Sequence, residues 1–142
     1  GVADFRELWL ELTVTDASGK LVLASGQPVD GAVPEDARLF RKVFGDAEGK
    51  PVGLKFWRYA KLLEDTRIPA DGWRDEVWPL PAEAQGPFKA DIKLNFRTYP
   101  KWVSDAVRAA EPSLPAPPIV QLNRLQLTLQ PLPITPATEP QS

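Results

Sequence analysis

Few side chains in this sequence are of the types that carry out chemistry. Its 142 residues include no cysteine, no histidine and no methionine. Disulfides, thiolate metal sites, CxxCH haem attachment and cysteine nucleophiles are therefore excluded. So are imidazole ligands, thioether ligands and Ser-His-Asp catalysis. The sequence also has no GxSxG, SxxK or Walker-type loop. We therefore predict that the chain is not an enzyme and holds neither a metal nor a cofactor.

Carboxylates are the remaining candidates for chemistry. Segments 16–20 and 46–50 each combine Asp with Gly. Neither has the ligand count of an EF-hand, and Asp and Gly favour turns, so we interpret both as turns. Asp65 and Glu76 would serve a hydrolase only if they shared a cleft. Arginines next to both in sequence favour surface ion pairs instead, so we rank the hydrolase last.

The five tryptophans are the candidates for binding. Trp9 alternates with leucines and so lies on the polar face of its strand, while Trp57 belongs to the cluster Phe56-Trp57-Arg58-Tyr59. These two are the expected exposed pair, and large exposed aromatic side chains mark interfaces. The other three have apolar neighbours and are expected in the core: Trp73, Trp78 and Trp102.

The elements that must position these residues show mainly a period of two. Apolar and polar residues alternate over 8–15 and over 88–97, and 21–25 returns as a hairpin partner. We also predict a short apolar segment at 37–44, strands at 54–63, 73–80, 119–122 and 125–129, and an amphipathic helix at 101–110. Segment 54–63 also fits a helical face, but its aromatic density favours a strand. The predicted fold is all-β and mainly antiparallel: an immunoglobulin-like β-sandwich of about seven strands with one short helix.

Composition sets the domain limits and excludes two classes of partner. Prolines crowd the end of the chain, so we predict one domain over 1–130 and a Pro-rich extended or disordered tail over 131–142. A net charge of −2 gives no basic surface for nucleic acid. No apolar run is long enough to span a membrane, and residues 1–4 do not resemble a signal peptide. The missing initiator methionine fits an excised segment of a longer protein.

Several segments follow one another in a recognisable order: 8–20, Ser25-Gly26, 40–49, Phe56-Trp57-Arg58 and Asp65-Thr66-Arg67-Ile68-Pro69. In this order the chain resembles the β-sandwich domain that lies C-terminal to the haem-binding part of bacterial multihaem c-type cytochromes, over about residues 5–130. Members carry their CxxCH sites in a separate N-terminal region that is absent here, and Gly53-Leu54-Lys55 occupies the stretch where a histidine is expected.

The resemblance implies a periplasmic or extracellular accessory module that docks on a haem-bearing cytochrome domain or subunit. Haem c would then be held only by that partner or by the absent N-terminal region. The residues expected to face the partner are Trp9, Trp57, Arg58, Tyr59 and Arg67. The alternative is a carbohydrate- or cell-surface-binding β-sandwich in which Trp9 and Trp57 stack on sugar rings. The oligomeric state stays open.

Overall fold

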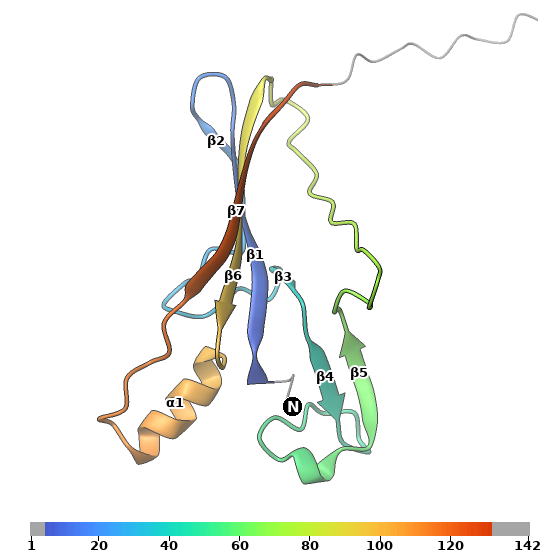
Figure 1. The fold of residues 1–142 in the computed structure, drawn as a ribbon, viewed down its shortest axis with the longest axis vertical. Helices are drawn as coiled ribbons and strands as arrows, with labels where there is room; N and C mark the ends of the chain where they lie inside the picture. The colour runs from blue at the N-terminus through green and yellow to red at the C-terminus, as the bar shows by residue number, and fades with distance from the viewer. Residues whose placement is uncertain (1–4, 132–142) are drawn as a thin grey trace, which may run out of the picture.

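Seven strands form two antiparallel sheets in the computed structural model, which describes residues 5–131 (Figure 1). The main sheet has the order β2-β1-β6-β7, and β3 pairs with β1 beside β2. β4 and β5 form the second sheet. The model confirms the predicted all-β, mainly antiparallel class with one short helix. The elements are β1 (Glu7–Thr15), β2 (Leu21–Ser25), β3 (Arg38–Leu39), β4 (Lys42–Gly45), the 3₁₀ helix η2 (Phe56–Arg58), β5 (Lys61–Asp65), β6 (Phe88–Arg97), α1 (Lys101–Ala110) and β7 (Val120–Leu129).

The strands with the strictest alternation lie at the centre of the main sheet. β1 and β6 pair without interruption from Glu7 opposite Arg97 to Thr15 opposite Lys89. This register places even-numbered apolar residues of both strands on one face and odd-numbered polar residues on the other. Across the odd face, the Glu11 carboxylate accepts hydrogen bonds from Lys93 at 2.8 Å and Asn95 at 3.0 Å. The charged side chains of this polar face therefore pair with each other across β1 and β6.

The main sheet buries different faces in its two halves. Near the β1–β2 turn the even face is buried, where Leu12 and Val14 pack with Phe88 and Ala90. Near the start of β1 the odd face is buried, where Trp9 packs with Ala37 and with Leu39 of β3. Alternation by itself would place the core on the even face along the whole of both strands, and the structure shows this for one half only.

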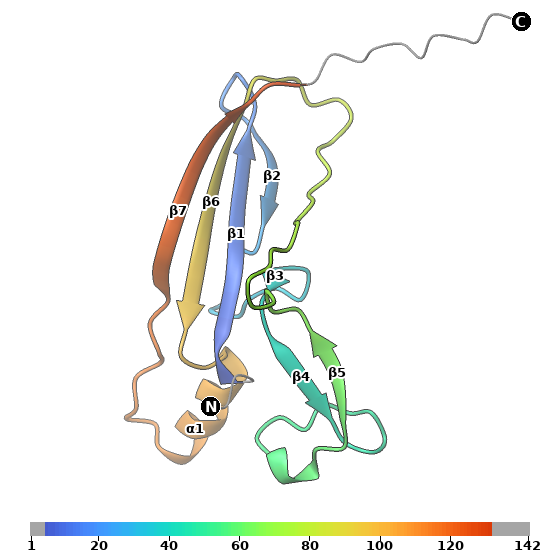
Figure 2. The ribbon, with the colours of Figure 1, turned by 45° about the vertical axis from the view of Figure 1, so that its right-hand side comes forward.

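The connection 66–87 covers the even face without joining the sheet (Figure 2). A strand over 73–80 was predicted, and this prediction is wrong: these residues have no strand pairing. Trp78 and Leu80 pack against the core cluster through their side chains alone. Pro79 and Pro81 lack backbone N–H groups, which disfavours ladder pairing here. The alternation over 73–80 therefore reflects the burial of alternate side chains and does not indicate a paired strand.

The second sheet projects from the main sheet as a hairpin. We call it the hairpin arm, and it consists of β4, β5 and residues 46–60 between them. The strand predicted over 54–63 is only partly present, because 56–58 form η2 and β5 begins at Lys61. Thr66 joins the arm to the main sheet: its N–H donates to the Arg41 carbonyl at 2.9 Å, and its hydroxyl donates to the Leu39 carbonyl at 2.7 Å. The same hydroxyl accepts the Arg41 N–H at 3.1 Å. We call these contacts the neck.

The helix and the last strand follow the sequence closely. α1 begins after Pro100 and spans the predicted residues, but of its apolar face only Val103 is buried, together with Ser104. The segments expected at 119–122 and 125–129 form one strand, β7, with a bulge opposite Leu94 and Asn95. Within residues 5–131, no helix has the length and apolar character to cross a membrane. The tail predicted over 131–142 lies, beyond residue 131, outside the described residues.

Candidate partner-binding site

The aromatic cluster predicted at 56–59 lies at the far end of the hairpin arm (Figure 1). Three successive turns build it, because Lys55, Arg58 and Tyr59 donate their N–H groups to carbonyls three residues earlier. No residue of η2 is buried, and Trp57 is 72% exposed. We call Phe56, Trp57 and Tyr59 the aromatic tip. Its exposure agrees with the expectation for Trp57 and Tyr59.

Two contacts with the rest of the hairpin arm hold the aromatic tip in place. Tyr59 packs edge-on against Phe44 with ring centroids 4.7 Å apart. Arg58 forms an ion pair at 3.4 Å with Asp46, whose side chain is only 10% exposed. The same carboxylate accepts the Lys50 N–H at 2.8 Å and so closes the 46–50 turn. Arg58 therefore anchors the tip, and the aromatic side chains remain at the surface.

Arg67 lies apart from the aromatic tip, beyond the opposite end of β5. Its guanidinium donates to both carboxylate oxygens of Asp65, at 2.8 and 2.9 Å. This hydrogen bonding lowers the pKa of Asp65 to about 2, further helped by the charge of Lys42. The predicted set Trp57, Arg58, Tyr59 and Arg67 is thus not one patch, because β5 separates its last member from the others.

Trp9 does not belong to the surface, and its expected exposure is wrong. Its side chain is 0% exposed, and its indole N–H donates to the Gly26 carbonyl at 3.0 Å. Arg97 lies over its ring at 5.9 Å. The odd face is buried in this half of the sheet, which alternation within one strand could not show. The platform of Trp9 and Trp57 for sugar rings therefore does not exist.

The other tryptophans also depart from expectation. Trp73 is 79% exposed and Trp102 is 48% exposed, although both were predicted in the core; Trp78 packs there as expected. Trp102 lies against Gly53, where an added Cβ would come within 3.5 Å of its ring. The helix α1 thereby contacts the arm close to the aromatic tip.

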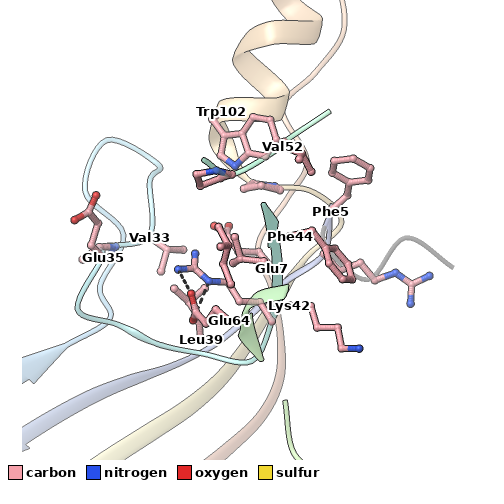
Figure 3. Close-up of a pocket in the computed structure, with 18 residues that line it drawn as sticks. Phe5, Glu7, Val33, Glu35, Leu39, Lys42, Phe44, Val52, Glu64 and Trp102 are labelled. Carbon is pink, nitrogen blue, oxygen red and sulfur yellow. Dashed lines mark hydrogen bonds and ion pairs between the residues drawn. The ribbon is translucent and has the colours of Figure 1, made fainter. Parts of the chain in front are cut away.

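A cleft of about 810 Å³ lies between the hairpin arm and the start of β1 (Figure 3). Its apolar walls come from stretches far apart in the chain and include Phe5, Val33, Phe44, Val52 and Trp102. Sequence reasoning missed this cleft, because no local pattern brings those segments together.

Two ion pairs lie on the walls of the cleft. Arg41 and Glu64 form a two-pronged pair on one wall, at 3.0 and 3.3 Å. Glu7 on the other wall pairs with Arg97. The cleft therefore combines apolar walls with two ion pairs formed within the chain itself.

The carboxylates considered for chemistry have structural partners. Glu76 lies between the guanidinium groups of Arg38 and Arg74, and Asp65 pairs with Arg67. Neither carboxylate lines the cleft. Asp16 accepts three hydrogen bonds from its own turn, in agreement with the turn interpretation. In the part of the chain that the structure describes, no three acidic side chains gather as a metal site.

Comparison with known proteins gives a match by fold. No protein-family model and no curated protein sequence matches the chain. A penta-heme cytochrome c552 from Thermochromatium tepidum is similar in structure, with a TM-score of 0.62 and 20% sequence identity. This chain shares its fold with part of a multihaem cytochrome. The match covers 88% of this chain but 31% of the cytochrome chain, so this chain spans about a third of that protein's length.

Proposed function

We propose that this chain is a non-catalytic docking module of a multihaem c-type cytochrome electron-transfer system and holds no haem itself. The observation that carries the proposal is the likeness to a penta-heme cytochrome, which extends over 88% of this chain. The lack of cysteine, histidine and methionine supports the haem-free role, because these residues attach or ligate haem c. The haem-bearing domain or subunit would meet it in the periplasm or outside the cell.

The aromatic tip is the surface we assign to this docking. Exposed aromatic side chains carry a large share of the binding energy at protein interfaces. Here Phe56 and Trp57 stand edge to face, with ring centroids 5.5 Å apart and planes at 77°. The Asp46–Arg58 ion pair holds the η2 backbone before binding, which limits the entropy lost on association. Buried Trp9 and distant Arg67 are not part of this surface.

Co-purification of the tagged chain from its native source tests the proposal. The partner fraction should show a Soret band and, after reduction, the α-band of c-type haem. Trp57→Ala should reduce the recovered haem by about 30-fold, the effect of truncating an interface hot spot. Trp73→Ala is the matched control, because Trp73 is equally exposed but outside the tip.

The outcomes separate the two parts of the proposal. A wild-type complex free of haem would overturn the cytochrome association. Equal haem recovery by both tryptophan variants would retain that association and remove the aromatic tip as its contact surface.

A further inference from the structure

The outer edge of β7 is the longest open strand edge of the main sheet. β7 pairs with β6 on one side, and within residues 5–131 no strand pairs with its other side. All ten of its residues are exposed, and its apolar side chains are 38–55% exposed. A long open edge presents a row of unpaired backbone N–H and C=O groups that can accept another strand.

Charge distinguishes β7 from the edge strand β5. Lys61, Glu64 and Asp65 give β5 three charges in five residues, and such charges discourage pairing with another edge. β7 carries one charge in ten residues, that of Arg124. Asp91 neutralises it within the same sheet through contacts of 2.7 and 2.8 Å. The edge of β7 is therefore close to electrically neutral.

The part of β7 beyond its bulge is regular. From Asn123 to Leu129 it pairs with β6 without interruption. Leu125 lies opposite Ile92 and Leu127 opposite Ala90, so these leucines share the apolar face of the sheet. Gln126 pairs with Asp91 on the other face.

We propose that β7 pairs antiparallel with β7 of a second copy of this chain, about a twofold axis at Gln126. The backbone N–H and C=O groups along one strand edge can pair with the C=O and N–H groups of the same edge in an antiparallel second copy. Because the edge is close to neutral, two copies of it do not repel each other. This register sets Leu125 opposite Leu127 of the other copy on the apolar face. It also sets Arg124 opposite Thr128, whereas an axis at Arg124 would oppose two guanidinium groups.

The surface involved is distinct from the docking surface proposed above. β7 belongs to the main sheet and the aromatic tip to the hairpin arm (Figure 2). Seven paired residues bury less than the roughly 800 Å² per partner of a standard stable interface. The pair is therefore weak, and its population rises with protein concentration.

The absence of cysteine allows a direct test of the register. Gln126→Cys places two thiols opposite each other across the axis, so mild oxidation should give a disulfide-linked dimer. Asn123→Cys is the control on the same strand. Its two copies would lie six residues apart, about 20 Å along the strands, beyond the reach of a disulfide. We expect at least ten-fold more cross-linked dimer from position 126.

Light scattering of the unmodified chain gives the second readout. The mass should rise from 15.7 kDa toward twice that value with concentration. Leu127→Lys should raise the dissociation constant at least ten-fold, whereas Leu62→Lys on the equally exposed β5 should not. Far-UV circular dichroism checks that both variants fold.

Three results would overturn the proposal. These are a monomer at every concentration, equal cross-linking at positions 123 and 126, or a mass that grows past two copies.

Discussion

The ion pair between Asp65 and Arg67 carries a pH dependence. Its hydrogen bonds hold the pKa of Asp65 at about 2, below the ordinary value of 3.8. A carboxyl whose pKa is lower in the folded chain adds stability above its unfolded pKa. That contribution is therefore present above about pH 4 and is lost as the pH falls toward 2.

Arg67→Gln should return the pKa of Asp65 toward 3.8, as followed by NMR titration of its carboxyl carbon. Asp91 is the internal control, because its pKa is lowered chiefly by a hydrogen bond from Arg124. An Asp65 titration unchanged by the substitution would contradict the assigned cause.

Replacing Gly26 by alanine should destabilise the fold strongly, although the change adds only one methyl group. Its φ is +77°, and an added Cβ would lie 2.1 Å from the Leu10 carbonyl oxygen. The same turn carries the carbonyl that binds the Trp9 indole. Gly19 has a φ of +84° but open space around it. Gly19→Ala should therefore cost only backbone strain, about 1–2 kcal/mol. Gly26→Ala should cost about twice as much or more by urea unfolding, and equal losses would contradict this account.

Among the elements, the hairpin arm depends on its neck. Thr66→Val keeps the side chain's shape but removes the hydroxyl that bonds to both Leu39 and Arg41. We expect a loss of about 1–3 kcal/mol. Hydrogen exchange should become about five-fold faster or more in β4 and β5, with β1 and β6 unchanged. Thr128→Val on exposed β7 is the control, and uniform acceleration throughout the chain would show that the arm is not a separate unit.

Local pattern predicts an element when backbone pairing and side-chain burial agree. They agree in β1 and β6, whose alternating residues both pair and pack. They disagree over 73–80, where Trp78 and Leu80 pack while the backbone is held by side chains instead. There the Val77 carbonyl accepts a hydrogen bond from Arg38, whose guanidinium also pairs with Glu76. A sequence contains the apolar pattern but not these distant partners.

At the scale of the whole molecule, the candidate site was only partly predictable. Trp57 and Tyr59 could be placed at the surface because large aromatic side chains clustered with an arginine are typical of interfaces. The burial of Trp9 and the cleft beside Trp102 could not be predicted, because both depend on segments far apart in the chain. The cytochrome resemblance and the structural likeness agree on the fold.

The change of buried face along the main sheet also governs which substitutions β1 and β6 tolerate. A strand covered on one face can vary freely at every second position. Here Trp9 is buried at an odd position and Leu12 at an even one. The positions that tolerate substitution are therefore even-numbered near Trp9 and odd-numbered near Leu12. In a saturation scan of β1, the pattern of tolerated positions should therefore change near Leu10 and Glu11. Polar substitutions should destabilise the fold at odd-numbered residues before this point and at even-numbered residues after it.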